Sequence, residues 1–402
     1  MALPYSSAAQ AMRSSEIRRI MKLAGDPSLI SFAGGTPGMP LLPVGIVDDI
    51  YAALTEQAKR VALQYGATDG YPPLMAEVKK YLASKNIIMD GQELIITTGA
   101  QQAINLVAKI FLDPGDVVVT EYPSFIGALA AFTSYGAKTV GVDMDNDGII
   151  VPKLLETLDK LGDKAKILYV TPYFHNPAGI IYSGLRKKQL LDALAGRNII
   201  LLEDDPYGEL YFDAADKPLT VPMKAMPHDG VNICYTGSFA KIFSPGMRLG
   251  WLCADAEISD KCQLAKQSMD ACSSTFAQVL AAEFLSRNKL PEYLKTLRAA
   301  YKRRADVMLN AMKKYMPEGV SWTIPKGGFY VWVTLPEYMD ASDVFKAAFD
   351  NGAAFVIGSA FDPAGKKNDC LRLAFSATQE DKIEQGIKIV GDAIKTKVKV
   401  KK

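Results

Sequence analysis

Short runs rich in valine and isoleucine alternate along the chain with longer segments of helical periodicity. Such runs are typical of buried strands, and strands that alternate with helices form a mainly parallel sheet with helices on its faces. The predicted strands are Leu94–Thr97, Val117–Thr120, Thr139–Val142, Ile167–Thr171, Ile199–Glu203, Ile233–Thr236 and Leu249–Cys253. The helices expected between them include Leu74–Ala83, Gln101–Leu112 and Leu185–Ala195. The sequence therefore predicts an α/β fold whose large domain has a mainly parallel, seven-stranded sheet flanked by helices.

The regular alternation of short apolar runs with helical segments ends after Ser274. A long charged helical segment that contains Tyr293–Tyr315 is followed by the apolar run Phe329–Val333. At roughly 150 residues per domain, a chain of 402 residues has room for two or three domains. We predict an N-terminal arm over residues 1–45 that packs with the small domain or over the active site, a large domain over 46–310 and a smaller α+β domain over 311–402.

Charge and composition argue against several classes of protein. The 46 lysines and arginines nearly cancel 44 acidic residues, whereas a dedicated nucleic-acid binder has a large, clustered basic excess. No apolar run approaches the roughly 18 residues of a membrane span, and the N-terminus lacks the order of a secretory signal. The five cysteines form no C-x-x-C pair and there are two histidines, so we expect free thiols and no metal site. We expect a cytoplasmic protein that binds neither nucleic acid nor membrane.

Lys241 follows a predicted strand and stands beside the apolar Ile242 and Phe243. Burial in such surroundings disfavours the ammonium form and leaves the amine available as a nucleophile. Ser238 and Arg248 flank the lysine with a hydroxyl and a guanidinium, which are groups suited to an anionic phosphate. In most proteins a single lysine is an exposed charge on the surface. This segment therefore leaves open whether Lys241 is a reactive amine or a surface charge.

Two further polar groups follow predicted strands. Asn176 opens the turn Asn-Pro-Ala-Gly that ends at Gly179, which by itself is also compatible with a simple Asx turn. Asp204 ends an apolar strand, where a buried carboxylate is costly unless it is paired, and Tyr207 follows it closely. Helix capping is the other interpretation of Asp204.

Gly99, Ala100 and Gln101 lie where a predicted strand turns into a predicted helix. The first N–H groups of a helix are unpaired and can bind a phosphate, and glycine allows close approach of the backbone. The chain has no G-x-x-x-x-G-K-[ST] loop. A plain turn between strand and helix is the alternative interpretation of this segment.

Arg372 stands inside an apolar run that resembles a strand. A buried guanidinium needs a partner, and a carboxylate that accepts two hydrogen bonds is its natural one. A structural ion pair is the alternative. Two aromatic residues, Phe125 and Tyr65, stand in loop-like segments and would singly be interpreted as core.

Taken together, the segment from Ser238 to Trp251 and the segments around Gly99, Asn176 and Asp204 resemble the motifs of fold-type I pyridoxal-phosphate enzymes, in the class I/II aminotransferase family. The resemblance covers roughly residues 10–395 and is specific because four separated segments agree. It implies an aspartate-aminotransferase-like fold, pyridoxal 5'-phosphate as cofactor and a transaminase activity. It also implies that Lys241 binds the cofactor covalently and later moves a proton as the general base.

The resemblance implies a role for each of the other residues. Asp204 would pair with the pyridine nitrogen, Asn176 and Tyr207 would bond the phenolic oxygen, and Arg372 would bind the substrate α-carboxylate. Phe125 would stack on the ring, in a position where the family often has tyrosine. The residues implied for the phosphate are Gly99, Ala100, Gln101, Ser238, Arg248 and, from the neighbouring subunit of a homodimer, Tyr65.

The N-terminal segments Met12–Lys22 and Leu29–Pro37 resemble the 2-aminoadipate, kynurenine and aromatic branch of the family. The resemblance implies that Arg18 binds a distal carboxylate of the substrate, although a solvated helix charge is the other interpretation. Gly35 would permit close approach of the substrate. We therefore predict a broad-specificity aminotransferase that moves the amino group of 2-aminoadipate, aromatic or branched-chain L-amino acids to 2-oxoglutarate.

Two other functions remain open at this point. A lyase on the same fold is one, since a fold does not decide the reaction. The other is a non-catalytic ligand-sensing module like that of certain bacterial regulators, which the sequence favours less because about 30 residues precede Gly34.

Overall fold

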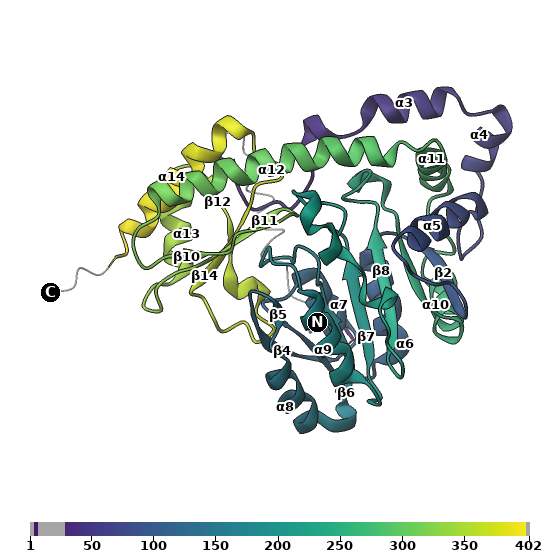
Figure 1. Cartoon of the computed structure of the whole chain (residues 1–402), viewed down its shortest axis with the longest axis horizontal. Helices are drawn as coiled ribbons and strands as arrows, with labels where there is room; N and C mark the ends of the chain where they lie inside the picture. Colours follow the sequence, from purple (N-terminus) through teal and green to yellow (C-terminus); the bar gives the residue numbers. More distant parts are fainter. Residues whose placement is uncertain (1–3, 7–28, 399–402) are drawn as a thin grey trace.

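The computed structural model describes residues 4–6 and 29–398. The centre of the molecule is an eight-stranded sheet in the order β2-β9-β8-β7-β6-β3-β4-β5 (Figure 1). Its strands are β2 (Gln92–Thr97), β3 (Val117–Tyr122), β4 (Lys138–Asp145), β5 (Gly148–Ile149), β6 (Ala165–Val170), β7 (Ile200–Asp205), β8 (Asn232–Ser238) and β9 (Gly250–Asp255).

The predicted α/β fold is confirmed, with one strand more than predicted. All seven predicted strands are present, and β8, β7, β6, β3 and β4 are parallel to one another. Strand β9 runs antiparallel to both of its neighbours, β2 and β8. The eighth strand, β5, pairs antiparallel with β4 and has two residues, so it leaves no apolar run that could be recognised in the sequence.

Helices cover both faces of this sheet because alternate side chains of each strand point to opposite faces. Leu202 of β7 packs in a core with α6 (Ala100–Phe111), α7 (Ile126–Ser134) and α10 (Ala256–Met269). Its neighbour Leu201 packs in a second core with α8 (Val151–Leu161) and α9 (Gly184–Leu194). A strand that is buried on both faces has a continuous apolar sequence, which is why the central strands could be recognised.

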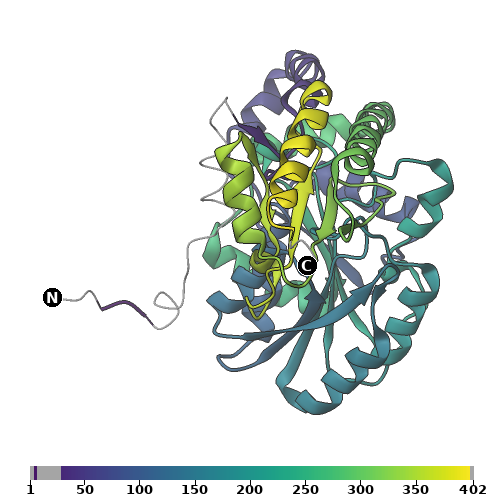
Figure 2. The same cartoon turned by 90° about the vertical axis from the view of Figure 1, so that its left-hand side faces the viewer.

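A second, four-stranded antiparallel sheet has the order β10-β11-β14-β13. Its strands are β10 (Ser321–Trp322), β11 (Tyr330–Thr334), β13 (Val356–Ile357) and β14 (Cys370–Ala374). Helices α13 (Ala341–Asp350) and α14 (Glu380–Lys395) belong to this part, and Figure 2 shows α14 between α13 and the long α12 (Leu290–Tyr315). Strand β1 (Ile30–Ser31) pairs in parallel with β12 (Ala353–Ala354), so the described end of the N-terminal segment contacts this smaller part.

Helix α12 extends from the large sheet to the small one (Figure 1). The predicted boundary between residues 310 and 311 falls inside this continuous helix, and the division into domains stays a prediction. The remaining helices are α3 (Val44–Ala52), α4 (Glu56–Ala62), α5 (Pro72–Ser84) and α11 (Thr275–Ser286), with 3-10 turns at Met39–Leu41, Gly162–Lys164, Ala214–Thr220, Met223–Ala225, Pro245–Met247 and Gly358–Phe361. Within the described ranges, no helix is both long and apolar enough to cross a membrane.

The carboxyl ends of the parallel strands meet at one edge of the large sheet. Asp204 stands near the end of β7 and Ser238 ends β8. Thr171 follows β6 directly, and Gly99 follows β2 after one residue. Ligands of open α/β sheets bind at this edge, which makes it the place to look for a functional site.

Candidate active site

Lys241 lies in the connection between β8 and β9. Its Nζ donates a hydrogen bond to the Gly35 carbonyl oxygen at 2.7 Å and lies 5.4 Å from the centre of the Phe329 ring and 5.8 Å from that of Tyr207. Burial, and after it the positive charge of Arg372, lowers the pKa of Lys241 to about 8. Roughly a tenth of this amine is therefore unprotonated at pH 7 and available as a nucleophile.

Asp204, near the end of β7, is also buried. Its Oδ2 accepts a hydrogen bond from the Tyr169 hydroxyl at 2.8 Å, whereas its Oδ1 is buried without a partner among the described residues. Burial raises the pKa of Asp204 to about 7. A buried acceptor of this kind is costly unless a donor reaches it. A protonated ring nitrogen is such a donor, so Asp204 fits the pyridine nitrogen of pyridoxal phosphate.

Arg372 extends from β14 of the small sheet and is buried. Its Nη1 donates to Asn176 Oδ1 at 2.8 Å and its Nη2 to the Ala33 carbonyl at 2.5 Å, while Nε has no partner among the described residues. The guanidinium lies 4.5 Å from the centre of the Tyr330 ring and 4.9 Å from that of Phe361. No carboxylate in the described chain pairs with it, so the structural ion pair considered above is not found there.

Tyr207 and Gly35 meet at Tyr330 of β11. The two tyrosine hydroxyls are 2.8 Å apart, and the rings pack edge to face. A Cβ at Gly35 would lie 1.9 Å from the Tyr330 hydroxyl oxygen, so only glycine fits at this position. Because Lys241 donates to the carbonyl of Gly35, these four residues form one cluster.

The turn between β2 and α6 lies beside Arg248. Gly99 has a φ of +78°, in the region that favours glycine, and a Cβ at Gly99 would lie 2.9 Å from Arg248 Nη2. Helix α6 begins at Ala100, so its first N–H groups have no partner within the helix. An exposed guanidinium beside a helix N-terminus is suited to a phosphate group. This end of the site therefore fits the phosphate of the cofactor.

Three more predicted residues lie near that turn. Ser238 Oγ accepts a hydrogen bond from the Ala240 N–H at 3.1 Å, which leaves the hydroxyl hydrogen available for donation. Gln101 Nε2 donates to the Gly127 carbonyl at 2.9 Å, so its side chain is held by the start of α7. Phe125 precedes α7, and a Cβ at Gly127 would lie 2.5 Å from its ring. The structure thus brings Phe125 and Gln101 together.

Two predicted residues are not brought into this site. Tyr65 follows α4 and is 87% exposed, with no ring contact or side-chain hydrogen bond to another described residue. Helix α4 lies at the end of the molecule away from the small sheet (Figure 1). Arg18 lies outside the described residues, so the structure gives no position for it.

Sequence analysis missed two tyrosines of the site, Tyr169 and Tyr330. Tyr169 stands inside the predicted strand that forms β6, and Tyr330 stands inside the apolar run Phe329–Val333, which contributes to β11. A tyrosine hydroxyl in a buried strand needs a hydrogen-bond partner, and this requirement is the signal that could have found them. The partners themselves, Asp204 and Tyr207, are distant in sequence.

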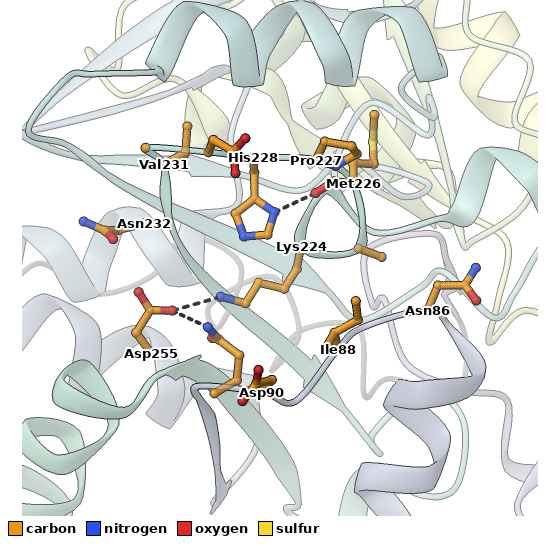
Figure 3. A pocket seen from close by; sticks show the side chains of 14 residues that line it. Asn86, Ile88, Asp90, Lys224, Met226, Pro227, His228, Val231, Asn232 and Asp255 are labelled. Carbon is orange, nitrogen blue, oxygen red and sulfur yellow. Dashed lines mark hydrogen bonds and ion pairs between the residues drawn. The ribbon is translucent and has the colours of Figure 1, made fainter.

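A cavity of about 590 Å³ lies at the opposite edge of the sheet, where β8 begins and β9 ends (Figure 3). Lys224 and Gln92 approach Asp255 Oδ1 there, at 3.5 and 2.6 Å. None of the predicted site residues lines this cavity. Among the residues placed by the structure, no group of three or more His, Cys, Asp or Glu side chains is arranged to hold a metal ion.

Comparison with known proteins gives a consistent result. The family of class I and II aminotransferases matches residues 40–390. The aromatic-amino-acid aminotransferase 1 of Thermococcus litoralis is 38% identical over 399 residues, which cover 98% of this chain and 95% of that protein. The 2-aminoadipate transaminase of Thermus thermophilus is 34% identical over 391 residues, which cover 97% of this chain and 96% of that protein. A crystal structure of Pyrococcus horikoshii kynurenine aminotransferase, in complex with PMP, has a TM-score of 0.94 and 38% identity over 99% of this chain and 98% of that chain.

We expect Lys241 of the cofactor-free protein to react with an amine-specific reagent with a pH midpoint near 8, because its burial disfavours the ammonium form. An ordinary lysine has its midpoint about two pH units higher. Peptide mass spectrometry after brief labelling at a series of pH values measures the reaction, with the exposed Lys382 as the reference. A midpoint near 10 for Lys241 would contradict the lowered pKa.

Proposed function

Because the chain belongs to the class I and II aminotransferase family and is a pyridoxal-phosphate-dependent transaminase, we propose that it accepts a broad set of L-amino acids with 2-oxoglutarate. The proposed donors are 2-aminoadipate, aromatic and branched-chain amino acids. The names of the similar aromatic and 2-aminoadipate enzymes support this range. The kynurenine enzyme of similar structure supports it as well.

One observation carries the proposal for this chain. Lys241 and Arg372 donate to the carbonyl oxygens of Gly35 and Ala33, which stand two residues apart in one segment. An amine nucleophile and an unpaired guanidinium are therefore held side by side. An α-amino acid presents a carboxylate that can pair with Arg372 and, on the adjacent Cα, a hydrogen that the neutral amine of Lys241 can remove.

We propose a distinct task for each residue. Bound pyridoxal phosphate supplies an electron sink for the bonds at the substrate Cα. Lys241 would hold the cofactor covalently until the substrate amino group takes its place there, and the freed Nζ would then take the Cα proton. Asp204 Oδ1 would hold the proton of the ring nitrogen. Arg372 would bind the α-carboxylate through its unpartnered Nε and through Nη2, in place of the Ala33 carbonyl, while Nη1 keeps its bond to Asn176. Tyr207 and Asn176 donate to the phenolic oxygen.

The phosphate is proposed to lie between the start of α6 and Arg248. Its contacts would be the N–H groups at the start of α6, the Ser238 hydroxyl and the guanidinium. The exposed side of this site needs one more contact, and we propose that Tyr65 of a second copy supplies it. Several apolar side chains of α3, α4, α11 and their loops are exposed and support a dimer through this end. They are Val44, Tyr51, Leu63, Tyr65 and Phe276.

We also propose that the protein works in the cytoplasm. All five cysteines are free in the structure, and four of them are buried. Buried free thiols suit a reducing compartment, where disulfides are rare.

Lys241→Ala is expected to abolish covalent attachment of the cofactor. The wild-type protein loaded with pyridoxal phosphate should be yellow, and borohydride reduction should leave the label on the peptide that contains Lys241. The variant should lose this label and at least about 10²-fold in transamination rate, since the general base is gone. Mass spectrometry and stopped assays measure both. A label on another lysine, or a wild type that binds no cofactor, would refute the assignment.

The donor range is tested with a panel of L-amino acids against 2-oxoglutarate. We expect steady formation of glutamate from aromatic, branched-chain and 2-aminoadipate donors. Release of pyruvate, a thiol or carbon dioxide without glutamate would identify a lyase instead. Binding of amino acids without any turnover would indicate the ligand-sensing module.

Arg372→Ala is expected to raise the KM of every amino donor by about 10- to 100-fold, because a charge-assisted pair of hydrogen bonds to the α-carboxylate is lost. Arg372→Lys should recover part of the loss, since it keeps the charge without the planar pair of donors. Arg303→Ala is the control, because Arg303 is an exposed member of a surface ion pair with Glu380. An effect limited to acidic donors would assign Arg372 to a distal carboxylate instead.

Mixing two inactive variants tests whether Tyr65 completes the neighbouring site. Tyr65→Ala and Lys241→Ala subunits, unfolded and refolded together, should form mixed dimers with one intact site each. With random pairing, about half of the dimers are mixed, and each mixed dimer has one intact site out of two. About one quarter of the wild-type sites should therefore be restored in a two-fold symmetric dimer. The assay is transamination at limiting pyridoxal phosphate. If the mixture has no more activity than the two variants refolded separately, Tyr65 acts within its own subunit or not at all.

A further inference from the structure

A buried hydrogen-bonded group lies directly behind the turn that carries Asn176. Glu121, near the end of β3, is fully buried and accepts hydrogen bonds from the Thr171 N–H at 3.0 and 3.1 Å and from the Tyr182 hydroxyl at 2.7 Å. His175 Nε2 lies 2.9 Å from Glu121 Oε2. Burying a carboxylate and an imidazole is costly, so a chain that needed only packing here would be served by apolar side chains.

His175 joins this group to the turn itself. Its Nδ1 accepts a hydrogen bond from the Ala178 N–H at 3.0 Å, so the ring hydrogen must be on Nε2, where it is donated to Glu121. The backbone of His175 also closes the turn, since its carbonyl accepts from the Gly179 N–H at 2.6 Å and its N–H donates to the Ile180 carbonyl at 2.8 Å. The ring and the backbone of His175 thus both hold the turn in which the next residue, Asn176, stands.

That next residue is Asn176, whose side-chain orientation is determined by Arg372. A guanidinium can only donate, so the atom of Asn176 that faces Arg372 Nη1 at 2.8 Å is the oxygen Oδ1. The amide nitrogen Nδ2 then faces away and has no hydrogen-bond partner among the described residues. A rotation of the turn would move the acceptor for Arg372 and the free donor together.

We propose that His175 and Glu121 are positioning residues, which hold Asn176 so that its oxygen orients Arg372 and its nitrogen faces the phenolic oxygen of the cofactor. This inference rests on the proposed function, in which Asn176 and Arg372 bind cofactor and substrate. His175 touches neither of them and acts through the turn. Glu121 determines which ring nitrogen of His175 carries the hydrogen.

The hydrogen position can be measured without cofactor or activity. The chain has two histidines, so selective ¹⁵N labelling gives two imidazole spectra, and His228→Gln tells them apart. His228 Nδ1 lies 2.6 Å from the Met226 carbonyl, which only accepts, so His228 carries its hydrogen on Nδ1 and serves as the opposite reference. We expect the neutral His175 ring to carry it on Nε2. A hydrogen on Nδ1 of His175 in the wild type would overturn the proposal.

Three variants of the cofactor-loaded enzyme separate positioning from packing. His175→Gln keeps a donor toward Glu121 and loses the acceptor for the Ala178 N–H. Glu121→Gln removes the carboxylate charge that accepts from Nε2; where its amide NH₂ faces the ring, the ring hydrogen must move to Nδ1, with the same loss at Ala178, and the ¹⁵N spectrum of the variant reports this move. Tyr182→Phe is the matched control, because it removes one hydrogen bond to Glu121 without touching the turn.

We expect His175→Gln and Glu121→Gln to raise the KM for amino donors three- to tenfold, the loss of about one hydrogen bond, with a smaller change in kcat. Both should also shift the pH midpoint of the visible absorbance of the bound cofactor. Tyr182→Phe should lower the melting temperature and leave both quantities unchanged. The proposal is wrong if the first two variants keep the wild-type KM and midpoint, or if Tyr182→Phe alters them equally. Failure of the proposed function itself would show in the wild type, as absence of the absorbance band and of turnover.

Discussion

Two mostly buried cations, Lys241 and Arg372, have no carboxylate partner in residues 4–6 and 29–398, and the arrangement of the site follows from this. Their donors reach backbone carbonyl oxygens and one side-chain amide. Carbonyl dipoles replace part of the lost hydration of a cation but leave its charge uncompensated. The negative charge must then come from bound molecules, and an amino acid carboxylate and a cofactor phosphate both provide it. The nearly neutral composition of the whole chain gives no hint of this local imbalance.

The two cations come from different parts of the fold and meet at one segment. Lys241 lies at the carboxyl edge of the large sheet and Arg372 on β14 of the small sheet, whereas Ala33 and Gly35 follow β1, which pairs with β12. The segment of Ala33 and Gly35 is bonded to the small part through Phe32, so a relative displacement of the two sheets would lengthen the Lys241–Gly35 and Arg372–Asn176 hydrogen bonds. Tyr330 of β11 adds a third contact across this boundary through the Tyr207 hydroxyl. The geometry of the site thus depends on how the small sheet packs against the large one.

The sequence was informative at two places where a charged residue interrupts or ends an apolar run. Asp204 and Arg372 were found on that basis, because burial of a charge without a stated partner is a local and recognisable anomaly. Tyr330 was not found, since its partner Tyr207 is 123 residues away and only the packing of the two sheets brings them together. Strand β5 was missed because two residues carry no periodicity. Tyr65 was predicted from the resemblance alone. A single chain does not test this prediction, because the proposed partner of Tyr65 lies in another copy.

The pKa of Lys241 connects the two anion-binding ends of the site. Burial lowers it most, and the charges of Arg372 and Arg248 lower it further. A carboxylate bound at Arg372, or a phosphate beside Arg248, cancels part of that charge and so raises the pKa of Lys241 again. The amine is therefore most easily deprotonated while the site is empty, which suits its proposed task as a nucleophile. It becomes a stronger base once both anions are in place, which suits the proposed removal of a proton from carbon.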